Sequence, residues 1–219
     1  MYIDDILVTG ATEEEHLQAL NAVLTRLEKA DLRAKKIKCA FMVHAVDYLC
    51  YRITVEGIRP LPSKVKAIKE APVPSNVTEL KAYLGLLTYC GKFLPNLSTT
   101  LAPLYSLLRK DSPWEWSADQ MEAFKQSKEL LTSSSLLIHF DPKLKLTLAC
   151  NASAYGIGAV LAHIMPDGSE KPIGYASRSL TSAERNYSQL EKEGLACIFG
   201  VKKFHDYVFG HPFELVTDH

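Results

Sequence analysis

The hydrophobic pattern of this 219-residue chain changes its period near residue 144, and this change limits the folds that the chain can adopt. Before that point, three pairs of the capping-box type open stretches with helical spacing: Thr12 with Glu15, Asn76 with Glu79, and Ser117 with Gln120. After it, Leu144, Leu146 and Leu148 alternate with other residues as in a β-strand. The pattern predicts an α+β chain whose last part is a mixed α/β sheet.

Spacing and turn residues locate the expected elements. We expect strands over 37–41, 48–55, 144–148, 156–163, 173–177 and 213–217. Helices are expected over 13–30, from 77 towards Pro95, over 98–109, from 118 to 131, and from 190 to about 210. A stripe of leucines on the first helix, Leu17, Leu20, Leu24 and Leu27, is expected to be core.

Four prolines, at 60, 62, 72 and 74, mark a boundary between the first segment and a basic one. Residues 59–110 hold eight Lys and Arg but only two Asp and Glu, although the net charge of the chain is zero. A basic segment beside a more acidic one suits a nucleic-acid clamp next to a metal-binding carboxylate site. The alternative is an ordinary solvated surface, which explains the same charges.

Composition excludes several classes of protein. No apolar run approaches the ~18 residues that a membrane span needs. The five cysteines are odd in number and form no C-x-x-C pair, so neither a disulfide framework nor a zinc site is indicated. The first residues carry acids where a signal peptide needs bases. We expect an intracellular protein, cytoplasmic or nuclear, that does not contact a membrane.

Asp4 and Asp5 lie between the apolar pairs Tyr2-Ile3 and Ile6-Leu7, as at the bend of a β-hairpin. Two carboxylates at a hairpin tip can bind Mg²⁺, which prefers oxygen ligands. Turns also favour Asp for purely conformational reasons, so the pair alone leaves both interpretations open.

The residues that flank Asp4 and Asp5 resemble a motif of a known family. Tyr2-Ile3-Asp4-Asp5-Ile6-Leu7-Val8 resembles the catalytic hairpin of reverse transcriptases. Later motifs resemble the palm and thumb of gypsy-class LTR-retrotransposon polymerases, among them Glu56-Gly57-Ile58-Arg59-Pro60, Leu84-Gly85-Leu86 and Lys92-Phe93-Leu94-Pro95-Asn96. Others resemble the tethered ribonuclease H domain of the same polyprotein, among them Asn151-Ala152-Ser153, Tyr175-Ala176-Ser177-Arg178, Glu191-Lys192-Glu193 and Thr217-Asp218-His219.

The resemblance implies four segments: the C-terminal part of the palm (1–60), a thumb (61–112), a connection segment (113–142) and a truncated ribonuclease H-like domain (143–219). The implied fold class is α+β, with a remnant polymerase palm, a small all-helical thumb and a truncated mixed-sheet ribonuclease H-like α/β domain. We expect the chain to be an internal fragment of such a polyprotein.

The resemblance also implies the catalytic carboxylates and Mg²⁺ as their cofactor. Asp4 and Asp5 match two of the three metal-binding carboxylates of the palm, the third being expected upstream. Glu193 and Asp218 match two of the four in the ribonuclease H site, and the fourth is expected beyond residue 219. Asn151 stands where the family has Asp, and an amide oxygen brings no charge to a metal ion.

The implied partner is an RNA–DNA hybrid or another nucleic acid, bound weakly. Lys64, Lys66, Lys69 and Lys92 are the candidate phosphate contacts, and a solvated lysine is the alternative for each. Self-association through an exposed sheet is a second expected contact.

We expect the chain to be inactive as a polymerase and as a nuclease, so whether it is an enzyme stays open. The alternatives are a residual nucleic-acid-binding module, a weak Mg²⁺-dependent nuclease of RNA–DNA hybrids, and a decayed reading frame without function.

Overall fold

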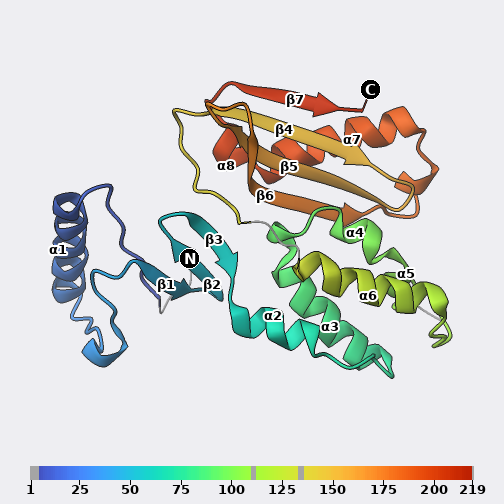
Figure 1. Cartoon of the computed structure of the whole chain (residues 1–219), viewed down its shortest axis with the longest axis horizontal. Coiled ribbons are helices and arrows are strands. Elements are labelled where there is room, and N and C mark those ends of the chain that lie inside the picture. Colours follow the sequence, from blue (N-terminus) through green and yellow to red (C-terminus); the bar gives the residue numbers. More distant parts are fainter. Residues whose placement is uncertain (1–4, 110–111, 133–135, 219) are drawn as a thin grey trace. The chain divides into compact units, whose positions relative to one another are not determined.

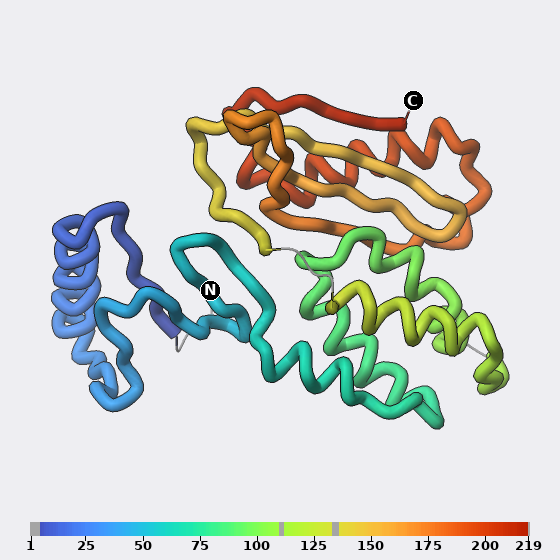
Figure 2. The backbone as a smooth tube through the Cα atoms, in the orientation of Figure 1, coloured from blue at the N-terminus to red at the C-terminus, as the bar shows by residue number. Residues whose placement is uncertain are grey.

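The computed structural model describes residues 5–109, 112–132 and 136–218. The chain divides into two compact units, Met1–Val55 and Glu56–His219, each of which is described by itself (Figures 1 and 2). Helices and strands both occur, so the α+β fold class is confirmed. The four segment boundaries expected from the sequence stay predictions.

The first unit holds one helix and one hairpin. Helix α1 (Glu13–Lys29) begins as predicted, because Thr12 Oγ1 accepts a hydrogen bond of 3.2 Å from the Glu15 amide. Strands β1 (Ala45–Tyr48) and β2 (Tyr51–Thr54) pair antiparallel around Leu49 and Cys50, whose φ angles are 47° and 61°. Two positive φ angles in a two-residue loop match the right-handed twist of the paired strands.

Two expectations for this unit are wrong. The strand expected over 37–41 is absent from the described residues there, and Lys36–Lys38 form a 3-10 turn (η1) because this stretch has no strand partner. The strand expected over 48–55 is shorter and follows a turn. The hairpin expected over 2–8 lies partly outside the described residues, and Ile6 to Val8, within them, are not in a strand.

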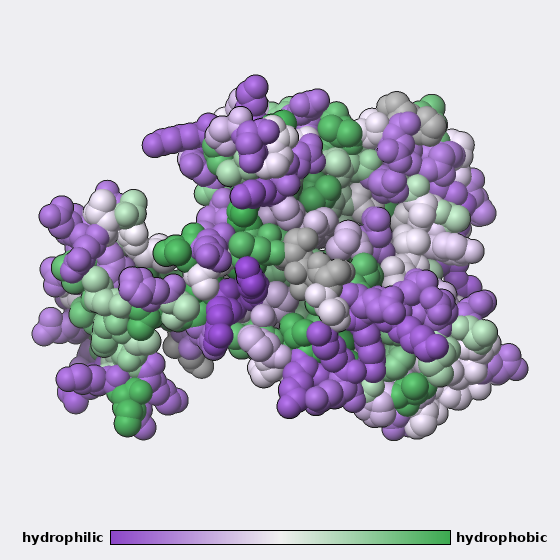
Figure 3. All heavy atoms as spheres, viewed as in Figure 1, coloured by the Kyte–Doolittle hydropathy of each residue, from purple (hydrophilic) through white to green (hydrophobic). Residues whose placement is uncertain are grey.

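The leucine stripe of α1 is not core. The side chains of α1 include no buried residue, and Leu17 and Leu24 are 47% and 44% exposed. Figure 3 shows hydrophobic atoms on the surface over this unit, at the left of the view. The spacing of the stripe correctly predicted a helix, but spacing alone cannot say whether the helix has something to pack against.

The second unit begins with strand β3 (Gly57–Pro60) and a group of helices. These are α2 (Pro62–Lys69), α3 (Val77–Tyr89), a 3-10 turn η2 (Gly91–Phe93), α4 (Leu97–Thr100), α5 (Ala102–Ser106) and α6 (Ala118–Thr132). Their shared core includes Ile68, Leu80, Leu87, Phe93 and Leu104, all fully buried. The single helix expected over 98–109 is wrong. It is split between α4 and α5 because Pro103 has no amide hydrogen to donate.

Four strands form the sheet of the second unit, in the order β6-β5-β4-β7 (Figure 1). They are β4 (Lys145–Ala152), β5 (Gly156–Ile164), β6 (Glu170–Ser179) and β7 (Phe213–Thr217). β4 pairs antiparallel with β5 and parallel with β7, and β5 pairs antiparallel with β6. This is the mixed sheet that the sequence predicted.

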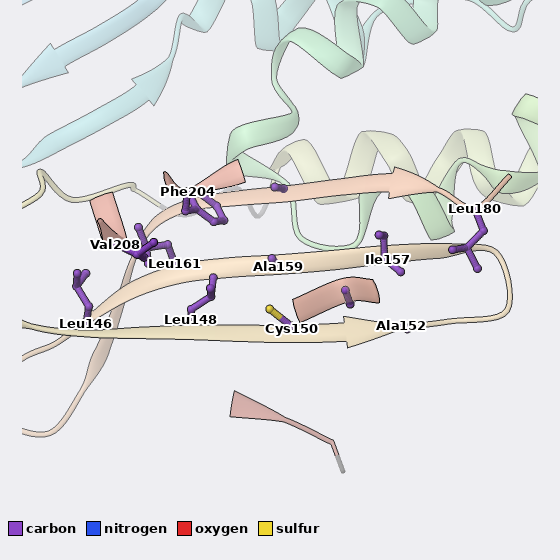
Figure 4. Packing of buried hydrophobic residues seen from close by; sticks show 12 residues of the cluster. Leu146, Leu148, Cys150, Ala152, Ile157, Ala159, Leu161, Leu180, Phe204 and Val208 are labelled. Carbon is purple, nitrogen blue, oxygen red and sulfur yellow. The ribbon is translucent and has the colours of Figure 1, made fainter. Parts of the chain in front are cut away.

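Helix α7 (Gln189–Lys203) covers one face of this sheet, and α8 (His205–Val208) follows it. One helix was expected to run to about 210, but the chain leaves the α-helical conformation at Phe204. Alternate residues of β4 and β5, including Leu146, Leu148 and Leu161, pack with Phe204 and Val208 in the core between sheet and helices (Figure 4). Asn151 follows this alternation to the opposite face of the sheet.

Candidate nucleic-acid and metal site

Asn151 and Asp218 meet at one end of the sheet. β4 and β7 are parallel neighbours with Cys150 opposite Thr217, so Asn151 in β4 and Asp218 just after β7 lie side by side. Asn151 Nδ2 donates a hydrogen bond of 2.8 Å to Asp218 Oδ2, and both side chains are exposed. The pair therefore links the ends of two strands by a neutral donor and a charged acceptor.

Glu193 lies on the other side of β4, in α7. Ser188 and Glu191 form the capping box that starts this helix, and its register turns Glu193 towards the sheet. Glu193 Oε1 accepts hydrogen bonds from the Ala152 amide (3.2 Å) and from Gln189 Nε2 (2.7 Å). The residue is only 3% exposed, and Glu193 Oε2 is buried without a hydrogen-bond partner in the described part of the chain.

These residues do not fit a divalent metal ion well. The Asn151 amide presents a donor to Asp218, whereas a metal ion needs an acceptor oxygen at that point. Glu193 Oε1 is committed to two donors. Within the described ranges, no three His, Cys, Asp or Glu side chains gather into a group that could hold a metal ion.

The palm carboxylates give less information. Asp4 lies outside the described residues, and Asp5 is exposed, its backbone carbonyl accepting a hydrogen bond of 3.2 Å from the Tyr48 hydroxyl. The roles assigned to Asp4, Asp5, Glu193 and Asp218 stay predictions.

The core beside Asn151 is apolar enough to shift the pKa of a buried thiol. Burial, with smaller effects from Cys197 and Glu193, raises the pKa of Cys150 to about 12. Cys150 is therefore a neutral core side chain near pH 7.

A bidentate ion pair holds the chain between β6 and α7. Arg178 donates to Glu184 at 2.7 and 2.9 Å, and the Thr181 amide donates to the same carboxylate at 2.8 Å. The hydrogen bonds from Arg178, followed by the one from Thr181, lower the pKa of Glu184 to about 2. The Glu184 amide in turn donates to Thr181 Oγ1 at 3.3 Å, and Glu184 begins a 3-10 turn, Glu184–Asn186 (η3).

The candidate phosphate contacts differ in exposure. Lys66 and Lys69 are exposed on α2, Lys66 lies 3.8 Å from Glu70, and Lys64 is partly buried. Lys92 is also partly buried, its Nζ lies 5.1 Å from the centre of the Phe93 ring, and burial lowers its pKa to about 8. A phosphate would therefore reach Lys66 and Lys69 more easily than Lys92.

A pocket of about 250 Å³ surrounds the exposed side of the Asn151–Asp218 pair. Its lining also includes Pro95, Asn96, Gly158 and Tyr175. Sequence reasoning missed these four residues because they come from elements whose contact is set by tertiary packing. The glycines of Gly156-Ile157-Gly158 were one available signal, since a repeated glycine in a strand indicates close approach of another backbone.

His163 is a further buried residue, one that no motif or spacing in the sequence singles out. It is fully buried, its Nε2 accepts a hydrogen bond of 2.9 Å from the Asp141 amide, and its Nδ1 donates to the Lys145 carbonyl at 3.1 Å. Both ring nitrogens are thereby hydrogen-bonded, so the residue fastens the chain before β4 to the sheet.

Two family models match the chain. One, described as reverse transcriptase (RNA-dependent DNA polymerase), matches residues 1–53, and one described as an RNase H-like domain found in reverse transcriptase matches residues 116–215. No helix in the described ranges is long and apolar enough to span a membrane.

Transposon polyproteins are similar to the chain over its whole length. The Tf2-3 polyprotein of Schizosaccharomyces pombe is 36% identical over 220 residues, and the Tf2-7 polyprotein of the same yeast is 35% identical. The match covers 100% of this chain, which spans about 16% of the length of these curated relatives.

Solved structures of foamy viral protease–reverse transcriptase are also similar. The dRH form in complex with double-stranded DNA has a TM-score of 0.79 and 26% identity, with 96% of this chain and 37% of that chain covered. The form in complex with an RNA/DNA hybrid has a TM-score of 0.78 and 26% identity, with 96% and 29% covered. With these likenesses, the chain belongs to the reverse-transcriptase family of transposon polyproteins, as a reverse-transcriptase segment joined to its ribonuclease H-like domain.

Proposed function

We propose that this chain is a nucleic-acid-binding part of a gypsy-class retrotransposon polymerase whose ribonuclease H-like site does not cleave RNA. The observation that supports this is the 2.8 Å hydrogen bond from Asn151 Nδ2 to Asp218 Oδ2. An amide and a carboxylate that bind each other hold one negative charge between them, where two carboxylates would hold two.

The loss of charge weakens the binding of any metal ion at this end of the sheet. Two-metal catalysis needs both ions fixed about 4 Å apart by oppositely charged ligands. Altered partners outside the ligand shell already cost about 10–100-fold in metal affinity or activity, so the loss of a charged ligand costs more. Mg²⁺ is therefore a cofactor of the parent enzymes that this site binds poorly.

Nucleic acid is the partner that best suits the helical segment. Lys66 and Lys69 lie exposed on α2, and the foamy viral relatives were solved with double-stranded DNA and with an RNA/DNA hybrid. Contacts between lysines and phosphates release counterions, so the binding is sensitive to salt. Phosphate contacts read no bases, so we expect binding that is indifferent to sequence and, with only a few such contacts, weak.

A cleavage assay decides the nuclease question. The chain is incubated with a labelled RNA–DNA hybrid and Mg²⁺, and we expect no product above a control without protein. If the chain cleaves the hybrid and Glu193→Gln abolishes cleavage, the proposal is wrong and the weak-nuclease alternative replaces it. Primer extension with dNTPs and Mg²⁺ tests the expected lack of polymerase activity in the same way.

The exposed edge of β7 is the proposed surface for self-association. β7 is the last strand in the order of the sheet, and Leu215 and Val216 on it are 46% and 42% exposed. Edge strands with exposed apolar side chains pair readily with other molecules. Sedimentation at micromolar concentration should reveal dimers, and a strictly monomeric sample would contradict this contact. An intracellular location, cytoplasmic or nuclear, completes the proposal.

A further inference from the structure

The short helix α4 and the residue before it lie on the open face of the sheet, over two glycines of β5. A Cβ atom built on Gly156 would lie 2.6 Å from Ser98 Oγ, and one on Gly158 would lie 3.1 Å from Asn96 Oδ1. Ser98 is only 6% exposed. The segment Pro95–Thr99 therefore lies close against β5: a side chain on Gly156 would displace Ser98, and one on Gly158 would press on the Asn96 side chain.

Polar contacts with the neighbouring strands fix this approach. Asn96 precedes α4 at a φ of 50° and makes no side-chain hydrogen bond to cap the helix. Ser177 of β6 supplies the missing acceptor, because its Oγ accepts a hydrogen bond of 3.1 Å from the Ser98 amide. The hydroxyls of Thr99 and Ser153 lie 3.0 Å apart. The first turn of α4 is thus capped by a side chain of the sheet.

We name Ser153, Gly156, Gly158 and Ser177 the α4 seat. Ser153 lies in the turn between β4 and β5, the two glycines lie in β5, and Gly158 is directly opposite Ser177 of β6 in their register. Along its other edge β5 pairs with β4, and there Gly158 is directly opposite Asn151. The seat therefore adjoins the end of the sheet where Asn151 meets Asp218.

The segment on the seat forms one wall of the pocket at this end. Pro95 and Asn96 line the same pocket as Asn151 and Asp218. We propose that Pro95–Thr99 is an intramolecular cover, docked on the α4 seat, that couples the helical segment to the sheet and bounds one side of the pocket around the exposed Asn151–Asp218 pair. A displacement of α4 would open the pocket without unfolding the sheet.

Hydrogen exchange measured by mass spectrometry tests the cover in the full chain. Gly158→Val should raise exchange in residues 95–101 about fivefold or more and leave residues 146–150 in the core strand as in wild type. The direction is diagnostic because valine favours strands, so Gly158→Val would stabilise a strand that has nothing docked on it. Gly194→Ala is the control, since a Cβ there meets nothing within 4 Å, and it should leave exchange in residues 95–101 unchanged.

Ser177→Ala keeps the proposal falsifiable if valine disturbs the sheet itself. It removes only the hydroxyl that caps α4, and exchange in residues 95–101 should again rise about fivefold. Unchanged exchange of this segment in Ser177→Ala overturns the proposal, whatever Gly158→Val does. Unchanged exchange in Gly158→Val overturns the close docking over β5.

Discussion

Asn151 differs from an aspartate by one amino group in place of one oxygen, and this exchange changes what the end of the sheet can bind. The amide donates to Asp218 at 2.8 Å, which joins two strand ends directly. An aspartate there would place two carboxylates within the same distance, and their repulsion would need a cation between them. With Asn151 the two strand ends are joined by a hydrogen bond that needs no metal ion, whereas two carboxylates would need a cation between them.

Asn151→Asp should make stability depend on Mg²⁺. Without metal, carboxylate repulsion should lower the Tm by about 2–4 °C, and Mg²⁺ should restore it. Mg²⁺ affinity should rise about tenfold or more, because a carboxylate attracts a divalent ion more strongly than an amide dipole. Thermal melts with and without EDTA, beside a Mg²⁺ titration, measure both effects.

The swapped double variant is the control for this prediction. Asn151→Asp combined with Asp218→Asn again pairs one amide with one carboxylate, so its Tm without metal should return towards the wild type. A Tm of Asn151→Asp that matches the wild type in EDTA would show that the hydrogen bond does not link the strands.

Glu184 should give the ribonuclease H-like part an acid-sensitive contact. Its folded pKa of about 2 is below the ordinary value of 4.5, so the carboxylate stabilises the fold at every pH above about 4.5. This contribution falls as the pH drops from about 4.5 through about 2, because the unfolded chain then takes up the proton more readily. Glu184→Gln should lower the Tm at pH 7 and flatten its decline below pH 4.5.

Melts from pH 7 to pH 2 measure that change in slope. Glu170→Gln is a suitable control, since it removes an exposed carboxylate at the start of β6 that forms no ion pair within the described ranges. If both variants follow the wild-type slope, the Arg178–Glu184 pair does not contribute to acid stability.

At the scale of elements, local chemistry was a reliable guide where a side chain caps a backbone. The Asn76 and Glu79 pair starts α3 through a hydrogen bond of 3.0 Å from the Glu79 amide to Asn76 Oδ1, as the sequence predicted. The strand expected over 37–41 was wrong because strand formation requires a partner, which no local pattern specifies. The contact between α4 and the glycines of β5 joins residues about 60 positions apart, so periodicity could not predict it.

Helix α2 is the element on which nucleic-acid binding should depend most. Replacing Lys64, Lys66 and Lys69 with Ala should weaken hybrid binding at ~50 mM salt and flatten the dependence of the logarithm of affinity on the logarithm of salt, because each phosphate contact releases about one counterion. Fluorescence anisotropy between 50 and 200 mM salt measures this slope. Exposed Lys125, Lys143 and Lys171, outside the helical segment α2–α5, provide a triple-alanine control. An equal loss in both variants would mean that net charge, and not α2, sets the affinity.

At the scale of the whole molecule, the two units differ in how much they bury. Helix α1 has no buried side chain, whereas α7, of similar length, buries Glu193, Ala196 and Gly200 against the sheet. An isolated helix of this length is marginal in water, because most helical stability in proteins comes from packing. The candidate sites in this chain therefore lie in parts of the structure that differ in stability. Asn151 and Asp218 are carried by a packed sheet, while Asp5 lies in the unit whose described residues, 5–55, include no buried side chain.

The last prediction is that the two units open at very different free energies. Amides of α1 should exchange with a free energy of opening near zero, whereas amides of β4 and α7 should require the global unfolding of their unit, on the order of 5–15 kcal/mol. Native-state hydrogen exchange at increasing urea concentrations measures each value. Leu148→Ala should lower the opening free energy of β4 and α7 together by about 2–5 kcal/mol, because Leu148 is fully buried in their shared core. Leu24→Ala, at an exposed position of α1, should leave β4 and α7 unchanged. If α1 instead opens with β4 and responds to Leu148→Ala, the chain folds as one cooperative body and the exposed leucines of α1 are not a measure of its stability.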